Sequence, residues 1–422
     1  MPQLAGLRVA IVNWRDPWHP SAGGAEQYAW QMALGLLARG ATVCYLTARA
    51  PGQSRSERRD GIQLVRTGSQ WTVYPGVLGW LARHRRRFDA VIDCQNGIPF
   101  FTPWVLPRRV PVLCVVHHVH DAQFGVHFSP MVARVGRLLE GPVARWTYRR
   151  HACVAVSEST VTAMRERLRW TGPIHVVPNG LAADSFDRPP SAATGAPSAP
   201  GAPIDGPVRE IAVLTWVGRL VAHKRVERVL DIAHRLGEGA VIDVIGRGPA
   251  AVPLAAEITA LRIGERVRLR GFLPEADKRA AVAGSLLHLN TSQGEGWGLC
   301  VLEAAALGVP TVAYDVDGLR DAVRDGETGW LVRADQRLDD VAERAVKELS
   351  DPVRRAEIAA ACRSWAGQFD WDSSAGLMAG LVAAAVRNSG GARPGGRGGS
   401  TPGGRDSRPD GRGGRHRADA DD

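Results

Sequence analysis

Residues 290–308 read Asn-Thr-Ser-Gln-Gly-Glu-Gly-Trp-Gly-Leu-Cys-Val-Leu-Glu-Ala-Ala-Ala-Leu-Gly. An apolar run ending at Leu289 predicts a strand, and the glycine-rich turn that follows it contains Glu295. A helical pattern of apolar residues then includes Glu303 and stops at Gly308. A strand that passes through a glycine loop into a helix presents free amide N–H groups to an anion. Because carboxylates flank that point, we expect an anion that also bears hydroxyl groups, such as a nucleotide sugar.

A second phosphate-binding element is predicted earlier in the chain. Residues 211–220 form an apolar strand that ends in Gly218-Arg219, and Lys224 precedes a predicted helix from about Arg225 to Leu236. Arg219 is suited to grip phosphate oxygens in a planar fork, and Lys224 supplies a compact point charge. The alternative is an ordinary solvated helix start. The glycine turn and the later acidic loop favour phosphate binding.

These elements resemble the retaining glycosyltransferases with two Rossmann-like domains, specifically glycosyltransferase family 4 (group 1), which has the GT-B fold. The resemblance extends over roughly residues 7–385, and its motifs follow the order of the family. Glu295 and Glu303 are separated by seven residues, as in the E-x7-E motif of the family. The other matching motifs are Gly23-Gly24-Ala25-Glu26, Val217-Gly218-Arg219-Leu220 with Lys224, Ile245-Gly246-Arg247-Gly248-Pro249, Gly271-Phe272, Asp317-Gly318-Leu319 and the stretch 325–332.

The resemblance implies a role for each matching residue. Glu295 would approach the transferred sugar, and His117, directly after a strand, would contact the same sugar; these two are the expected catalytic residues. His118 is the alternative if the match is shifted by one position. Glu303 would bind the nucleotide ribose. The implied ligands of the donor diphosphate are Gly23, Gly24, Arg219, Lys224, Trp297, Gly298 and Leu299.

The resemblance also implies the chemistry. Transfer would proceed with retention at the anomeric carbon, without a divalent metal, and the departing phosphate oxygen would take the proton of the acceptor hydroxyl. The nucleotide-diphosphate sugar, UDP- or GDP-linked, would be a co-substrate, and no other cofactor is expected. His117, His118 and His120 invite a metal site, but no carboxylate or thiol pair completes a ligand set, so none is predicted.

Alternating strand-like and helix-like segments predict the fold class, which is α/β with two Rossmann-like, doubly wound domains that face each other across a cleft. Ligands of such sheets bind beyond the carboxyl ends of the strands. The expected units are an N-terminal acceptor-binding domain over residues 1–186, a Pro/Ala/Gly-rich linker over 187–207, a donor-binding domain over 208–370, a helix over 371–387 that crosses back to the first domain, and a disordered Gly/Arg/Pro/Asp tail over 388–422.

Composition places further bounds on the protein. No run of about 18 apolar residues occurs, so no spanning helix is expected. The N-terminus enters a strand without the pattern of a secretory signal. The six cysteines are scattered, mostly within apolar runs, which favours buried thiols in a reducing cytoplasm over disulfides or zinc sites.

The positive charge is concentrated in the N-terminal half. Residues 1–183 contain 22 arginines and 10 acidic residues, whereas the whole chain has a net charge of +10. Arginines alternate with apolar residues over Leu78–Arg87 and Met131–Arg150, as in helices that lie on an anionic membrane. The alternative is a pair of amphipathic core helices with solvated basic faces.

The leading hypothesis is a glycosyltransferase with a glycan or lipid-linked acceptor, cytoplasmic and in peripheral contact with the membrane. The alternatives are a nucleotide-sugar epimerase or glucan phosphorylase of the same fold, or a sugar-nucleotide-binding protein without activity. A nucleic-acid-binding protein is not expected, because the basic tail contains five aspartates and lacks aromatic residues for base stacking.

Overall fold

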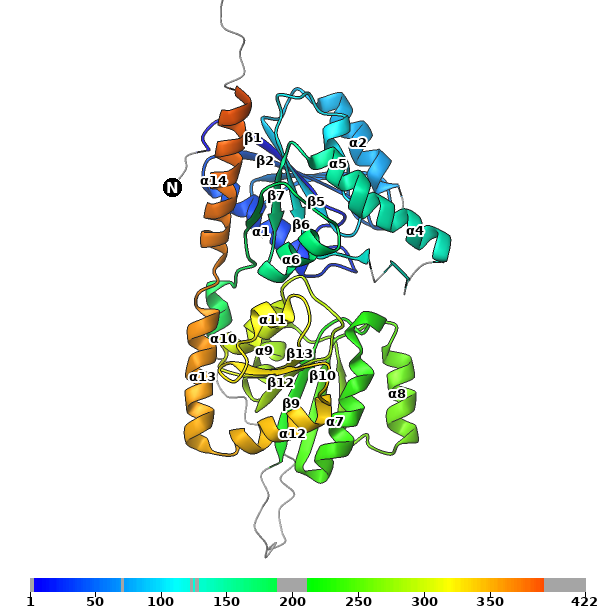
Figure 1. Ribbon diagram of the computed structural model, residues 1–422, viewed down its shortest axis with the longest axis vertical. Coiled ribbons are helices and arrows are strands. Elements are labelled where there is room, and N and C mark those ends of the chain that lie inside the picture. The colour runs from blue at the N-terminus through cyan, green and yellow to red at the C-terminus, as the bar shows by residue number, and fades with distance from the viewer. Residues whose placement is uncertain (1–3, 70–71, 122–123, 126–128, 188–210, 391–422) are drawn as a thin grey trace, which may run out of the picture.

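The computed structural model describes residues 4–69, 72–121, 124–125, 129–187 and 211–390. Two α/β domains lie one above the other, each with a parallel sheet between layers of helices (Figure 1). This architecture confirms the predicted fold class. Almost all of the predicted linker and most of the predicted tail lie outside the described residues. The helix that precedes the tail continues to Gly390, so the boundary predicted at residue 388 is wrong by three residues.

The N-terminal sheet has eight strands in the order β3-β4-β2-β1-β5-β6-β7-β8. All neighbouring strands are parallel except β3 and β4. Strand β3 escaped prediction because its sequence, Ser-Glu-Arg-Arg, has no apolar residue. The strands are β1 (Arg8–Val12), β2 (Thr42–Thr47), β3 (Ser56–Arg59), β4 (Ile62–Arg66), β5 (Ala90–Gln95), β6 (Val112–Val116), β7 (Ala152–Ala155) and β8 (Ile174–Val176).

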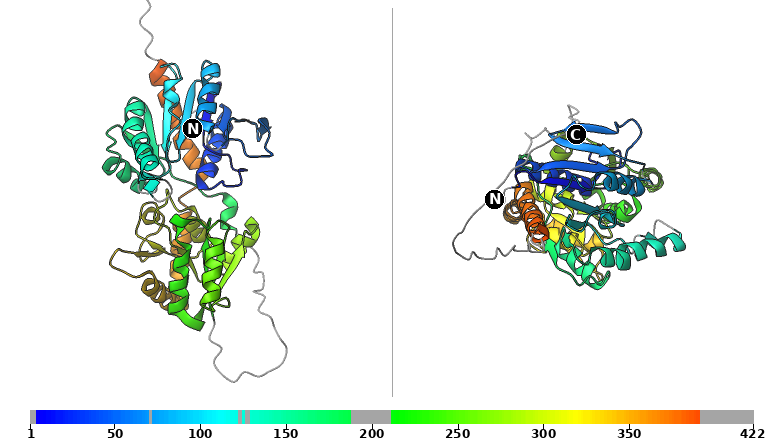
Figure 2. Two further views of the ribbon diagram at one scale, coloured as in Figure 1. Left: turned by 90° about the vertical axis from the view of Figure 1, so that its right-hand side faces the viewer. Right: turned by 90° about the horizontal axis from the view of Figure 1, so that it is seen from above.

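The helices of this domain cover both faces of its sheet (Figure 2). The helical pattern of the sequence predicts one continuous helix over Pro130–Arg149. In the structure this stretch contains a π-helical turn, because Pro142 has no amide hydrogen to donate and its ring crowds the preceding turn. The helical segments before the chain first leaves this domain are α1 (Gly24–Ala38), α2 (Val73–His84), η1 (Thr102–Trp104), α4 (Pro130–Leu138), η2 (Leu139–Val143), α5 (Ala144–Tyr148) and α6 (Glu158–Glu166); the short η3 (Ala183–Phe186) follows the crossing.

The C-terminal sheet has six strands in the order β11-β10-β9-β12-β13-β14, all parallel. Its strands are β9 (Ala212–Val217), β10 (Ala240–Ile245), β11 (Val267–Gly271), β12 (Leu287–Asn290), β13 (Thr311–Tyr314) and β14 (Gly329–Val332). Its helical segments are η4 (Ala222–Lys224), η5 (Val226–Arg228), α7 (Val229–Leu236), η6 (Gly237–Gly239), α8 (Ala251–Ala260), α9 (Glu275–Ala283), α10 (Leu299–Ala306), α11 (Leu319–Ala322), α12 (Leu338–Leu349) and α13 (Pro352–Ala366).

The helix predicted from Arg225 to Leu236 begins later than expected. Arg225 adopts a left-handed conformation with φ of 46°, which separates η4 from η5, and α7 starts only at Val229. The Arg225 guanidinium donates to the Thr291 carbonyl oxygen at 3.1 Å and stacks on Tyr314. These contacts with Thr291, which follows β12, and with Tyr314 of β13 hold the backbone out of the helix.

The chain passes between the domains twice, at adjacent points. Leu181 already packs in the core of the C-terminal domain, and its amide donates to the Phe369 carbonyl oxygen at 3.0 Å. The first crossing therefore precedes the predicted boundary at residue 186. After the second crossing, α14 (Trp371–Gly390) packs along α1 and completes the N-terminal core, as Figure 1 shows.

Candidate active site

The loop between β12 and α10 contains Glu295, which lies ahead of the helix as expected. Its carboxylate forms an ion pair with Lys224 and accepts a hydrogen bond from Ser292 Oγ at 2.7 Å. Burial raises the pKa of Glu295, but the charge of Lys224 and these hydrogen bonds outweigh it, so the net shift is downward. Burial lowers the pKa of Lys224, and Glu295 more than reverses this effect. Both groups are therefore charged at neutral pH.

The N-termini of α1 and α10 meet across the domain boundary. A Cβ atom built on Gly24, at the start of α1, would lie 3.0 Å from Leu299 Cδ1, at the start of α10. A Cβ on Gly23 would lie 3.9 Å from Arg219 Nε. Arg219 is exposed, and no carboxylate among the described residues pairs with it. Two helix N-termini and an unpaired guanidinium thus converge on one point, as an anion site requires.

Arg15 belongs to this cluster and was not among the predicted site residues. Its Nε lies 3.8 Å from Glu26 Oε1, while Glu26 Oε2 accepts the Gly23 amide hydrogen at 2.7 Å. Burial lowers the pKa of Arg15; Glu26 opposes this shift, and the positive charge of Arg219 adds to it. The position of Arg15 just after β1, at the carboxyl end of the sheet, was the signal that could have identified it.

His117 and His118 occupy different places at the domain boundary. His117 is 6% exposed, its ring meets Tyr28 edge-on, and its Nε2 has no partner among the described residues. The His118 ring packs on Gly294 and hydrogen-bonds the main chain of Glu295. Burial, reinforced by His120, lowers the pKa of both rings to about 3, so both are neutral at physiological pH.

His120 is occupied by structural contacts. Its amide donates to Glu140 Oε1 at 2.6 Å, and its ring Nδ1 lies 2.9 Å from the His118 carbonyl oxygen. Within the ranges that the structure describes, no group of three or more His, Cys, Asp or Glu side chains is arranged to hold a metal ion.

Glu303 lies on α10 and is paired with Lys278. The Lys278 Nζ is 3.0 Å from Glu303 Oε2 and 2.9 Å from Glu275 Oε1. Burial raises the pKa of Glu303, and Lys278 only partly offsets this effect. Lys278 was not among the predicted site residues. The Trp297 side chain points away from this region, into the C-terminal core against Phe369, so only the main chain of Trp297 remains available to a donor.

The comparisons with known proteins agree with this arrangement. A family model described as glycosyl transferases group 1 matches residues 207–365, and one described as Glycosyltransferase Family 4 matches residues 22–185. The chain is a group 1 glycosyltransferase. A D-inositol 3-phosphate glycosyltransferase of Xylanimonas cellulosilytica is 28% identical over 92% of this chain and 99% of its own length. A glycogen synthase of Mycobacterium tuberculosis is 26% identical over 90% of this chain and 81% of its own length.

Solved structures identify the fold of this glycosyltransferase as GT-B. A sucrose-phosphate synthase from Thermosynechococcus elongatus aligns with a TM-score of 0.75, at 17% identity over 90% of this chain and 100% of that chain. HepE of Anabaena, solved with UDP and glucose, aligns with a TM-score of 0.67, at 18% identity over 90% of this chain and 100% of that chain.

Proposed function

We propose that this glycosyltransferase moves a sugar, with retention of anomeric configuration, from a UDP- or GDP-linked donor to an acceptor hydroxyl. The observation that supports the proposal is the convergence of Arg15, Arg219 and Lys224 with two helix N-termini, directly beside the Glu295 carboxylate. A diphosphate would supply the anionic partner that Arg219 lacks among the described residues. A sugar attached to it would then lie next to Glu295.

The proposed reaction breaks the bond between the anomeric carbon and the phosphate oxygen. The three cations and the amides at the start of α10 stabilise the charge that develops on the leaving diphosphate, the role a divalent metal would otherwise fill. The departing phosphate oxygen takes the acceptor proton as the new bond forms on the same face of the sugar. Lys224 turns from Glu295 towards the diphosphate, and the freed carboxylate binds sugar hydroxyls. Glu303 holds the ribose in competition with Lys278.

Titration calorimetry with UDP and GDP in the presence of EDTA tests the donor site. We expect one nucleotide to bind tightly without metal, and Glu295→Ala to retain this binding while losing transfer. Product analysis by NMR would show whether the anomeric configuration is retained. Binding that requires a metal, or an inverted product, would contradict the mechanism. Absence of binding to both nucleotides would contradict the donor class.

On the acceptor side, we propose that the N-terminal domain rests on an anionic phospholipid surface and draws a lipid-linked acceptor from it. Helix α4 projects from the side of this domain (Figures 1 and 2). Met131, Val135 and Leu138 recur at helical spacing along α4. The exposed apolar side chains of α4 and α5 are Met131, Val132, Val135, Leu138 and Trp146, each at least 50% exposed. Arg134, Arg137, Arg145 and Arg149 alternate with them. Basic and apolar groups on one helix suit an anionic membrane interface.

A basic hollow continues this surface. It is lined by residues that include Arg85, Arg86, Trp104 and Arg109, and Trp104 Nε1 donates to Thr147 on α5 at 3.1 Å. Trp104 therefore joins the two basic stretches singled out in the sequence. No helix in the described part of the chain is long and apolar enough to cross a membrane, so the proposed contact is peripheral.

Vesicle flotation tests this contact. We expect the wild type to float with phosphatidylglycerol vesicles and not with phosphatidylcholine vesicles, and Met131→Ser with Leu138→Ser to reduce flotation. Leu377→Ser on α14 is the control, because Leu377 and Leu138 are both 52% exposed. Equal flotation of the double variant and the control would contradict the proposal that α4 contacts the membrane.

A further inference from the structure

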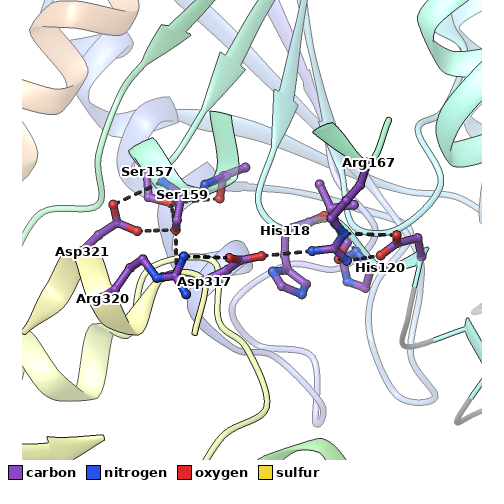
Figure 3. Close-up of polar contacts among 12 residues, drawn as sticks. His118, His120, Ser157, Ser159, Arg167, Asp317, Arg320 and Asp321 are labelled. Atoms are coloured by element: carbon purple, nitrogen blue, oxygen red, sulfur yellow. Dashed lines mark hydrogen bonds and ion pairs between the residues drawn. The ribbon is translucent and has the colours of Figure 1, made fainter. Parts of the chain in front are cut away.

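A polar contact joins the two domains next to the Glu295 loop (Figure 3). Ser159, in the first turn of α6, is 5% exposed. Its hydroxyl donates to Asp321 of α11 and accepts the Gly318 amide hydrogen at 2.7 Å, and its own amide donates to Asp321 Oδ1 at 3.2 Å. One serine of the N-terminal domain thus forms three hydrogen bonds with the C-terminal domain.

An ion pair reinforces the same contact from the other end of α6. Arg167 Nη1 donates to Asp317 Oδ2 at 3.0 Å, and Arg167 also pairs with Asp121 within its own domain. Figure 3 shows Asp317 facing Arg167, beside the contact between Ser159 and Asp321. Because the Arg167 side chain is only 32% exposed, its charge is less screened than in a fully solvated pair.

The C-terminal partners in this contact also support Glu295. The Glu295 amide donates to the Asp317 carbonyl oxygen at 2.9 Å. Gly318 has a φ of 76°, and a Cβ there would overlap the Glu295 carbonyl oxygen, so only glycine lets the two main chains approach this closely. The segment from Asp317 to Asp321 is therefore bound on one side to the N-terminal domain and on the other to the main chain of Glu295.

The main chains of the two domains also touch at Gly296, the residue after Glu295. A Cβ on Gly296 would overlap the carbonyl oxygen of His117, so main chain meets main chain at this point. The described structure is thus the closed arrangement, in which Ser159 and Arg167 reach their partners. If the domains separated, both contacts would break, and Glu295 would keep only its partners within the C-terminal domain.

We propose that Ser159 and Arg167 are positioning residues that fix Glu295 in its working orientation only when the domains close. This inference rests on the proposed function of Glu295. A diphosphate held by Arg219 and Lys224 binds to the C-terminal domain before closure, so losing Ser159 or Arg167 affects turnover more than nucleotide affinity. The segment 317–321 connects the domain contact with Glu295, because it bonds to Ser159 and Arg167 on one side and to the main chain of Glu295 on the other.

The test compares Ser159→Ala with Glu158→Gln, and Arg167→Met with Arg165→Met. Glu158 and Arg165 lie on the same helix, and within the described residues their only side-chain hydrogen bond is from Arg165 to the Trp170 carbonyl oxygen, inside the N-terminal domain. The assay is hydrolysis of UDP-glucose or GDP-mannose, whichever the wild type cleaves. We expect kcat to fall about tenfold for each positioning variant, the loss of roughly one hydrogen bond, with the Kd for the nucleotide diphosphate within about twofold. The control variants should match the wild type.

A double-mutant cycle and small-angle scattering separate the outcomes. The effect of the double variant Ser159→Ala/Asp321→Ala should be smaller than the sum of the two single effects, because both changes remove the bond between the Ser159 hydroxyl and Asp321. The positioning variants should also increase the radius of gyration of the nucleotide-bound protein.

The inference would be overturned if the wild type hydrolyses the donor and Ser159→Ala and Arg167→Met have the same kcat as the wild type. An equal loss of kcat and affinity would do the same. Absence of wild-type hydrolysis and of nucleotide binding would instead overturn the proposed function, and an unchanged radius of gyration would still count against the domain contact.

Discussion

Arg15 and Arg219 approach one point from opposite domains, and the Glu26 carboxylate lies 3.8 Å from Arg15 Nε. Like charges that converge in a partly buried site repel each other, and an anion placed between them replaces that repulsion with two attractions. A bound diphosphate would therefore strengthen closure at the same time as it is held. The arrangement links donor affinity to the distance between the domains.

We expect Arg15→Gln to weaken binding of UDP or GDP about tenfold or more, as expected for the loss of one charge-assisted hydrogen bond. Binding of the nucleoside, which lacks phosphate, should not change. Arg49→Gln is the control, since Arg49 is exposed on the same domain. Calorimetry with nucleotide and nucleoside measures both. If nucleoside and nucleotide binding weakened equally, Arg15 would act on the fold and not on phosphate.

At the level of single residues, motif spacing predicted the groups that a ligand would need but not the groups that the protein itself pairs with them. Glu295, Lys224 and Arg219 came from their places after strands. The pairing of these side chains could not be predicted in this way, because the Lys224–Glu295 and Lys278–Glu303 pairs form between segments distant in sequence. Arg15 was missed because Trp-Arg-Asp after a strand matches no motif.

Helices α1 and α14 pack so closely that one position admits only glycine. A Cβ built on Gly35, in the last turn of α1, would overlap the Cβ of Ala375, in the second turn of α14. This contact fastens the last helix to the N-terminal domain. Close approach of the two backbones lets the larger side chains on either side, Met32 and Met378 among them, become fully buried.

We expect Gly35→Ala to lower the free energy of unfolding by about 1–3 kcal/mol through overpacking, even though alanine favours helix. Adding Ala375→Gly should recover most of this loss by restoring the space. Gly380→Ala on α14 is the matched control; nothing lies within 4 Å of a Cβ there, so stability should rise by up to about 1 kcal/mol. Urea denaturation measures all three. An unchanged free energy of unfolding in Gly35→Ala would contradict the conclusion that Gly35 and Ala375 leave no room for another Cβ.

The elements themselves were largely predictable, because apolar periodicity persists through each buried strand and helix. The apolar pattern of the sequence predicts strands over Thr42–Thr47, Ile62–Arg66 and Val112–Val116, and β2, β4 and β6 have these bounds in the structure. The exceptions arise from contacts outside the element. Edge strand β3 pairs through its backbone without an apolar face, and Arg225 leaves the helical region to bind the Glu295 loop.

Buried neutral histidines make the stability of the whole molecule depend on pH. Burial lowers the pKa of His117, His118 and His288 to about 3, whereas the unfolded chain protonates histidine near pH 6.5. Between these values the unfolded state binds more protons, so stability falls as the pH decreases. Each such histidine contributes about 1.4 kcal/mol per pH unit in that window.

We therefore expect the free energy of unfolding to decrease from pH 7 to pH 5. The slope of this decrease should be smaller in His288→Gln, by an amount that corresponds to about one proton taken up on unfolding. His288 lies in β12 within the C-terminal core, so the variant will be less stable at pH 7 and only the slope is compared. His175→Gln, at an exposed position of β8, should leave the slope unchanged. Urea denaturation at several pH values gives the slopes. The same slope in all three proteins would contradict the assignment.

At the scale of the molecule, the sequence predicted two domains and their order but placed the first crossing between them too late. Composition marked the proline-rich segment as the boundary, whereas the structure places Leu181 and η3, both before that segment, against the C-terminal domain. Composition identifies a segment that has too few apolar residues to pack in a core. It does not indicate against which domain the short segment before it packs.

The return of α14 to the N-terminal domain has a consequence for synthesis of the protein on the ribosome. Trp371, Ala375, Met378 and Val382 complete the apolar core against α1, yet they are made after the entire C-terminal domain. Translation of the roughly 200 intervening residues takes on the order of 10–40 s. Throughout that time the nascent N-terminal domain presents the uncovered face of α1, a binding surface for chaperones, and its folding ends only when the last helix emerges.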